Sequence, residues 1–103
     1  MLNNEAPPTI KPSKGMFGSK GERPGLFNNP WGVSFDYRSE RIFVNDCFNN
    51  RLQVFDRKGS FLATFGARGK RPGEFELPHG LCFQPSTNNL VVTEYDNNRV
   101  QVL

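Results

Sequence analysis

Two kinds of side chain in this sequence could recognise a ligand: cations in stretches rich in Gly and Pro, and aromatic rings beside them. Five of the 13 basic residues fall in two such stretches. Arg and Lys can bind phosphate or carboxylate groups, and an aromatic face can stack on a nucleobase or accept an Arg or peptide side chain. The predicted binding face consists of Lys20, Arg23, Trp31, Arg51, Arg68, Lys70, Arg71, His79 and Arg99.

Few residues have the types and spacing of a catalytic or metal site. The single histidine, His79, and the two cysteines, Cys47 and Cys82, form neither a CxxC pair nor a His-containing cluster. We expect both cysteines to be core-facing or half-buried thiols, because free cysteine is usually buried. Free thiols fit a reducing compartment, so the sequence favours a cytoplasmic location. Because no motif of a catalytic or metal site is present, the sequence predicts no cofactor.

An internal repeat must position these side chains. Residues 17–55 align without a gap to residues 65–103 at a constant offset of 48, and 16 of the 39 aligned pairs are identical. The identities fall on turn formers and core aromatics, such as Gly18/Gly66 and Phe27/Phe75. A fixed period of about 20–50 residues is typical of solenoids, propellers and arrays, and it outweighs the usual assumption of one domain for a chain of this length.

Period-two alternation divides the repeat into short strands. The sequence predicts strands over 32–36, 41–45, 51–56 and 60–65, joined by tight turns. Only 36% of residues are apolar, with 10 Gly and 8 Pro, which disfavours the long periodic stretches of helical repeats. A Gly/Pro-rich passage, 66–78, must then cross to the next set of strands, and Phe75 is the expected plug of that crossing.

The FG-x2-G-x2-PG-x-F-x2-P-x-G run, followed by V-x-D/E-x2-NNR-(L/V)-QV, resembles NHL repeats, the propeller modules of tripartite-motif and related RING-containing proteins. The resemblance covers residues 17–103. It implies an all-β fold, an incomplete β-propeller with one full four-stranded antiparallel blade and a partial second blade. The expected organisation is a disordered or linker lead-in (1–15), the end of a preceding blade and crossing loop (16–31), blade 1 (32–65), a second crossing loop (66–79) and an incomplete blade 2 (80–103).

In such a blade, the turns between the second and third strands share one face with the crossing loops, so the candidate cations gather there. Acidic neighbours dilute this charge, and the whole chain carries only +3. Structural roles compete with binding: Trp31 could pack between blades, and Asn-Asn could form the turn by bonding its own backbone. Arg51 and Arg99 could pair with Asp46 and Glu94, as surface ion pairs contributing about 0–1 kcal/mol.

Three functions remain open. The leading hypothesis is a non-catalytic module that binds a protein or single-stranded RNA, which the resemblance implies would recognise substrates for a RING ubiquitin ligase. One alternative is part of a propeller enzyme, a lyase or hydrolase with a channel metal. The other is architectural, an extracellular or bacterial sensor propeller or a filament-like assembly of open blades. Metal analysis would separate the enzyme from the binding module. We expect no membrane or DNA partner, but expect further blades of the same parent chain or self-association, because about three repeats are needed for a stable core.

Overall fold

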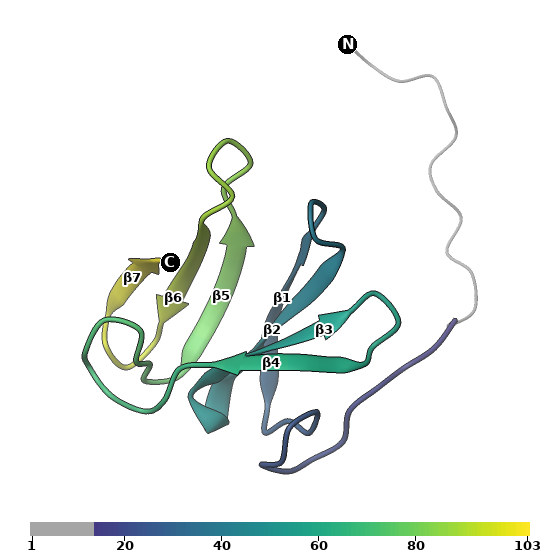
Figure 1. The fold of residues 1–103 in the computed structure, drawn as a ribbon. Coiled ribbons are helices and arrows are strands. Elements are labelled where there is room, and N and C mark those ends of the chain that lie inside the picture. The colour runs from purple at the N-terminus through teal and green to yellow at the C-terminus, as the bar shows by residue number, and fades with distance from the viewer. Residues whose placement is uncertain (1–13) are drawn as a thin grey trace, which may run out of the picture.

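The computed structural model describes residues 14–103 as two antiparallel sheets lying side by side (Figure 1). The lead-in predicted for residues 1–15 therefore lies largely outside the described residues. The first blade has the order β1-β2-β3-β4 and the second β5-β6-β7. Their strands are β1 (Pro30–Asp36), β2 (Arg41–Asp46), β3 (Arg51–Asp56) and β4 (Phe61–Phe65), then β5 (Pro78–Phe83), β6 (Leu90–Glu94) and β7 (Arg99–Val102), with a 3-10 turn, η1, at Cys47–Asn49. The predicted all-β, incomplete propeller is confirmed.

The strand boundaries differ from the sequence prediction by one or two residues. The first strand begins at Pro30 instead of Gly32, because Pro30 pairs with Asp46 across an irregularity in the register. The fourth strand begins at Phe61, because the Ser60 carbonyl closes the preceding turn by accepting the Asp56 N–H at 2.9 Å. The alternation within strands explains these small errors, since it indicates the centre of a strand better than its ends.

The larger of two hydrophobic core clusters in residues 14–103 lies between the two blades, and the other packs Phe27 on Val44 and Phe55 of the first blade. Leu52 of β3 and Phe43 of β2 pack in one cluster with Val92 of β6 and with Phe75 from the second crossing loop. Phe75 is fully buried, which confirms its predicted role as the plug. Its ring occupies the space beside Gly66, where an added Cβ would lie 2.4 Å from a ring carbon. Glycine is therefore required there both for its φ of +93° and for space.

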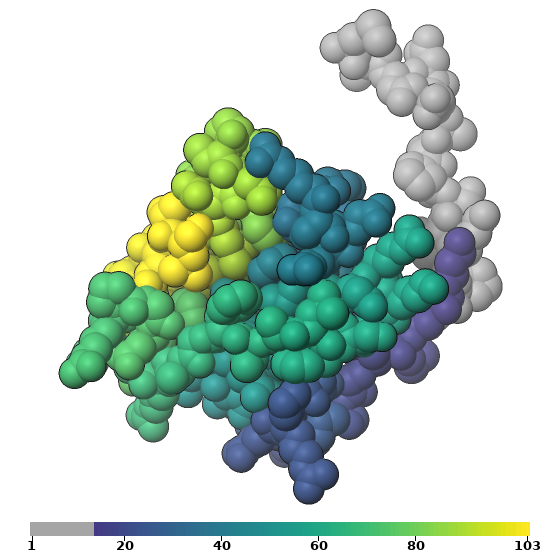
Figure 2. All heavy atoms as spheres, viewed as in Figure 1, coloured from purple at the N-terminus to yellow at the C-terminus, as the bar shows by residue number. Residues whose placement is uncertain are grey.

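Each blade has two faces, which we name by their packing. The trailing face of the first blade, with Leu52 and Val54, turns toward the second blade, whose leading face carries Phe75 and Val92. Leu52 and Val54 are only 1% and 2% exposed, whereas their repeat equivalents on the trailing face of the second blade, Val100 and Val102, are 60% and 58% exposed. The yellow strand β7 accordingly lies at the molecular surface (Figure 2).

The open trailing face also explains an error in the sequence prediction. Cys47 is buried as expected, but Cys82 is exposed. In the β5-β6-β7 sheet Cys82 pairs with Val91, which pairs with Val102, so the three share the uncovered trailing face. Cysteine burial therefore depends on a neighbouring blade. Among residues 14–103, no helix has the length and apolar composition needed to cross a membrane.

Candidate functional site

The two crossing loops and the turns between the second and third strands of each blade meet at one end of the sheets, here called the loop face. The Phe48 N–H donates to the Asn28 carbonyl at 3.1 Å, and the Tyr95 N–H donates to the Leu77 carbonyl at 3.0 Å. In each blade the turn is thus hydrogen-bonded to the crossing loop that precedes it. The loop face comprises residues 18–29, 47–50, 66–77 and 95–98.

A buried carboxylate organises the loop face of each blade. Asp46, whose side chain is fully buried, accepts hydrogen bonds from Arg51 at 2.8 Å, Asn49 at 2.9 Å and Gln53 at 3.0 Å. It also accepts the Asn28 N–H at 2.7 Å, which ties the crossing loop to the turn. Because the donors come from a turn, a strand and a loop, one carboxylate fixes the relative position of all three.

Glu94 repeats this arrangement in the second blade. It accepts from Arg99 at 2.6 Å, Asn97 at 2.6 Å and Gln101 at 2.8 Å, and from the Glu76 N–H at 3.2 Å. Burial alone would raise the pKa of Glu94, but these donors together lower its pKa below the ordinary value. The longer glutamate side chain therefore replaces aspartate without loss of the network.

Arg51 and Arg99 belong to this framework, the hydrogen-bond networks around the buried carboxylates of Asp46 and Glu94. The Arg51 Nη2 donates to the carbonyls of Arg23 at 3.2 Å and Leu26 at 3.1 Å, while Arg99 donates in the same way to its own crossing loop. Both guanidinium groups are thus engaged by a carboxylate and by loop carbonyls. The expected pairing of Arg51 with Asp46 and of Arg99 with Glu94 is confirmed, but the expectation that these are surface pairs was wrong, because both carboxylate side chains are fully buried. Breaking a buried pair costs more than breaking a surface pair.

The Asn-Asn turns differ in part from the sequence interpretation. Asn50 and Asn98 adopt left-handed backbone with φ of 52° and 50°, as a tight turn requires. The side chain of the preceding residue, however, bonds to the crossing loop: Asn49 donates to the Gly21 carbonyl at 2.9 Å. The Asn50 Oδ1 reaches the next blade and accepts the Leu77 N–H at 2.8 Å.

The remaining predicted cations lie exposed on the loop face. Lys20 and Arg23 belong to the first crossing loop, and Lys70 and Arg71 to the second. Arg68 is 77% exposed and contacts Glu76 with a separation of 3.3 Å, a distance at which an exposed ion pair contributes little. The crossing loops therefore present five cations to solvent beside the framework.

Trp31 and His79 lie beside these loops and contact each other across the two blades. Their rings stack with centroids 4.1 Å apart and an interplanar angle of 19°, although Trp31 remains 60% exposed. Tyr95 follows, with its ring centroid 5.9 Å from that of His79. The rings border a cleft of about 260 Å³ lined by Asn29, Trp31, Cys47, Phe48, Leu77, His79 and Tyr95. The packing of Trp31 between the blades is confirmed by its stack on His79, and its role in binding at this aromatic cleft stays a prediction.

Sequence reasoning missed the other two aromatic members of the cleft, Phe48 and Tyr95. Both side chains are exposed, and both lie in the turns that reach the loop face. The repeat gave no signal for them, because Phe48 aligns with Asp96 and Tyr95 with Cys47. Their position in those turns could have placed them beside Trp31 and His79.

The inner strands approach each other closely below the cleft. A Cβ added to Gly32 of β1 would lie 2.5 Å from the His79 carbonyl oxygen of β5. The same carbonyl accepts a hydrogen bond from Asn45 Nδ2 at 2.7 Å. Gly32 thus permits the approach that brings Trp31 and His79 into contact. Within residues 14–103, no three or more His, Cys, Asp or Glu residues gather as metal ligands would.

Comparison with known proteins agrees with this architecture. Residues 32–101 match a family model described as a 6-bladed beta-propeller. The matched segment runs from the first strand of the first blade to the last strand of the second, and it includes both turns of the loop face.

Individual relatives match a shorter segment. Protein lin-41 of Caenorhabditis elegans is 46% identical over 47 residues, which is 46% of this chain and 4% of the relative. The E3 ubiquitin-protein ligase TRIM71 of Rattus norvegicus and that of Mus musculus are each 51% identical over 45 residues, or 44% of this chain and 5% of the relative. The aligned segments thus correspond to about a twentieth of each relative's length.

Proposed function

Because the chain belongs to the six-bladed β-propeller family, with two adjacent blades of that fold, we propose that it is a non-catalytic binding module whose loop face binds single-stranded RNA. The observation that carries this proposal is the aromatic cleft between the blades, flanked by exposed cations. Proteins that bind single-stranded nucleic acid combine aromatic rings that stack on bases with a cationic path for the phosphates.

Each part of the loop face has a role in the proposal. The exposed ring of Trp31, already held by His79 on one side, offers its other surface to an unpaired base. The cleft beside it is lined by Phe48 and Tyr95, whose rings can receive a neighbouring base. Arg23, Arg68 and Arg71 on the crossing loops would contact phosphates. The buried Asp46 and Glu94 networks hold these loops in place before binding, which reduces the entropy cost.

The test measures anisotropy of a fluorescent single-stranded RNA at increasing salt. Replacing Arg23, Arg68 and Arg71 together by Ala should lower the affinity and reduce the slope of log K against log salt by about 2, because each phosphate contact contributes about 0.7. Trp31→Ala should weaken binding by ~1–3 kcal/mol, roughly 5- to 150-fold, with a smaller effect on the slope.

A matched control changes three exposed cations at the opposite end of the sheets, Arg38, Arg57 and Lys58, to Ala. This variant removes the same net charge but leaves the loop face intact, so it should retain most of the affinity. Equal losses for the two triple variants would show nonspecific attraction to the whole surface and contradict the proposal.

The names of the relatives favour a second candidate, recognition of a protein. TRIM71 is named as an E3 ubiquitin-protein ligase. A parent of that type would use this module to hold a substrate protein, with the aromatic cleft receiving an Arg or other peptide side chain. In the anisotropy experiment, RNA binding that is absent, or unchanged by Trp31→Ala and the cationic variant, would favour this candidate.

A further inference from the structure

The two exposed faces of the blade pair are the repeat equivalents of the two faces that pack together between the blades. The trailing face of the second blade repeats, at an offset of 48 residues, the trailing face of the first, which already packs on a leading face. The leading face of the first blade likewise repeats that of the second. The interface between the blades is therefore a template for what can cover the exposed faces.

The match extends to backbone shape. In the internal interface, Asn50, with φ 52°, accepts a hydrogen bond from the N–H of Leu77, also with φ 52°. The equivalent residues on the outer faces are Asn98, with φ 50°, and Asn29, with φ 60°. Both outer partners thus have the conformation of the internal pair, and little rearrangement is needed for them to meet.

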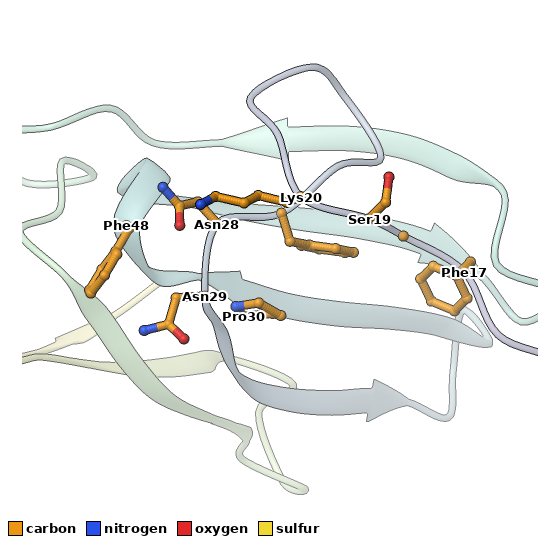
Figure 3. A pocket seen from close by; sticks show the side chains of 9 residues that line it. Phe17, Ser19, Lys20, Asn28, Asn29, Pro30 and Phe48 are labelled. Carbon is orange, nitrogen blue, oxygen red and sulfur yellow. The ribbon is translucent and has the colours of Figure 1, made fainter.

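The leading face of the first blade also contains a cavity for this contact. The cavity measures about 610 Å³, and its lining includes Phe17, Phe27, Asn29 and Phe48 (Figure 3). In the second blade, Leu77, equivalent to Asn29, is bonded to the turn of the preceding blade. The turn at Tyr95–Asn98 is the repeat equivalent of that turn.

The first residues described supply the complementary strand. Within the first blade, Leu52 pairs with Phe65 and Gln53 with Thr64. Val100 and Gln101 are the repeat equivalents of Leu52 and Gln53, and Phe17 and Met16 are those of Phe65 and Thr64. The same pairing between two copies would therefore join Val100 to Phe17 and Gln101 to Met16. Phe17 already packs on Phe55, with ring centroids 4.8 Å apart, on the leading face of the first blade. It is thus positioned to lie between that face and the open edge of a β7 strand.

We propose that copies of this chain associate head to tail, the trailing face of one second blade covering the leading face of the next copy's first blade. The segment around Met16 and Phe17 adds a fourth strand to the neighbour's β5-β6-β7 sheet, a known mode of strand addition. A head-to-tail contact forms a closed ring when its rotation closes. The family has six blades and residues 30–102 form two of them, so three copies of these 103 residues would supply the blades of one ring.

The mass of the full chain in solution tests this proposal. At tens of micromolar, sedimentation equilibrium should give about 35 kDa, three times the 11.7 kDa of one chain, as a closed three-fold ring requires. Val100→Asp on the trailing face and Val33→Asp on the leading face should each give the mass of one chain. Both side chains are largely exposed in a single copy, so a retained circular dichroism spectrum would show that each variant still folds.

Mixing these two variants distinguishes head-to-tail association from other forms. Each variant keeps one intact face, and the intact faces are complementary, so an equimolar mixture should give the mass of two chains. Ser86→Asp, a similar change in an exposed residue of the turn between β5 and β6, should leave the three-chain mass unchanged.

Other outcomes would overturn the proposal. The first is a single-chain mass for the unaltered protein at about 100 µM, a concentration at which a specific interface of ordinary size is occupied. The others are an open-ended distribution of masses, an unchanged mass in Val100→Asp, and no pairing in the mixture.

Discussion

The two repeats have nearly the same pattern of residues but different surroundings, and the difference shows what stabilises each. Phe75 is completely buried between the blades, whereas its equivalent Phe27 retains 8% exposure on the open leading face. Pro78 is buried, but Pro30 is exposed. Part of a residue's burial in this fold therefore comes from the neighbouring blade, and the outer copy of each pair lacks that part.

The largest effect should come from removing the plug between the blades. Phe75→Ala should destabilise a single chain by ~3–5 kcal/mol, because it leaves a cavity in the core shared by the blades. Phe27→Ala should cost less, since only one blade surrounds that ring. Urea unfolding of both variants in the Val100→Asp background, which holds the chain as one copy, measures the difference. Equal losses would show that the packing between blades contributes nothing.

A second pair of variants sharpens the comparison at the inner strands. Gly32→Ala places a methyl group 2.5 Å from the His79 carbonyl oxygen, a backbone atom that cannot move without shifting β5. We expect a loss of ~1–3 kcal/mol from this overpacking. Gly80→Ala, at the equivalent position, meets only the Thr93 hydroxyl at 3.1 Å, so its effect should be smaller. Thermal unfolding gives both values, and the reverse order would place the contact between β1 and β5 in doubt.

The smallest effect concerns acid stability. The folded chain holds the pKa of Glu94 below its ordinary 4.5, so the ionised group stabilises the fold above that pH. This contribution is lost as the pH falls through the lowered pKa, where protonation breaks the bonds to Arg99 and Gln101. Glu94→Gln should be less stable at neutral pH and lose less stability on acidification. An unchanged acid profile in unfolding experiments would contradict this role.

The sequence predicted the features that depend on the repeat. The constant offset and the turn residues located four strands, the plug Phe75 and the common end of the crossing loops. These succeed because turn backbone and core alternation impose their requirements locally. The fold of each blade could therefore be predicted before its packing was known.

Features that depend on packing across blades could not be predicted. Cys82 was expected to be at least half-buried, yet it lies on the open trailing face. The ion pair of Asp46 was expected at the surface, yet its carboxylate is buried because the crossing loop covers it. The contributions of Tyr95 and Phe48 to the cleft depend on how two turns converge, which neither residue type nor spacing reveals.

The most direct test of the central claim, that the two repeats pack as neighbouring blades, is a nuclear Overhauser measurement between Phe43 of β2 and Phe83 of β5. Their rings meet edge to face with centroids 4.9 Å apart, and they belong to different sheets. The structure predicts strong cross-peaks between the two sets of ring protons. Intact strand contacts within each sheet without these cross-peaks would show that the blades fold separately and would contradict the shared core and the loop face.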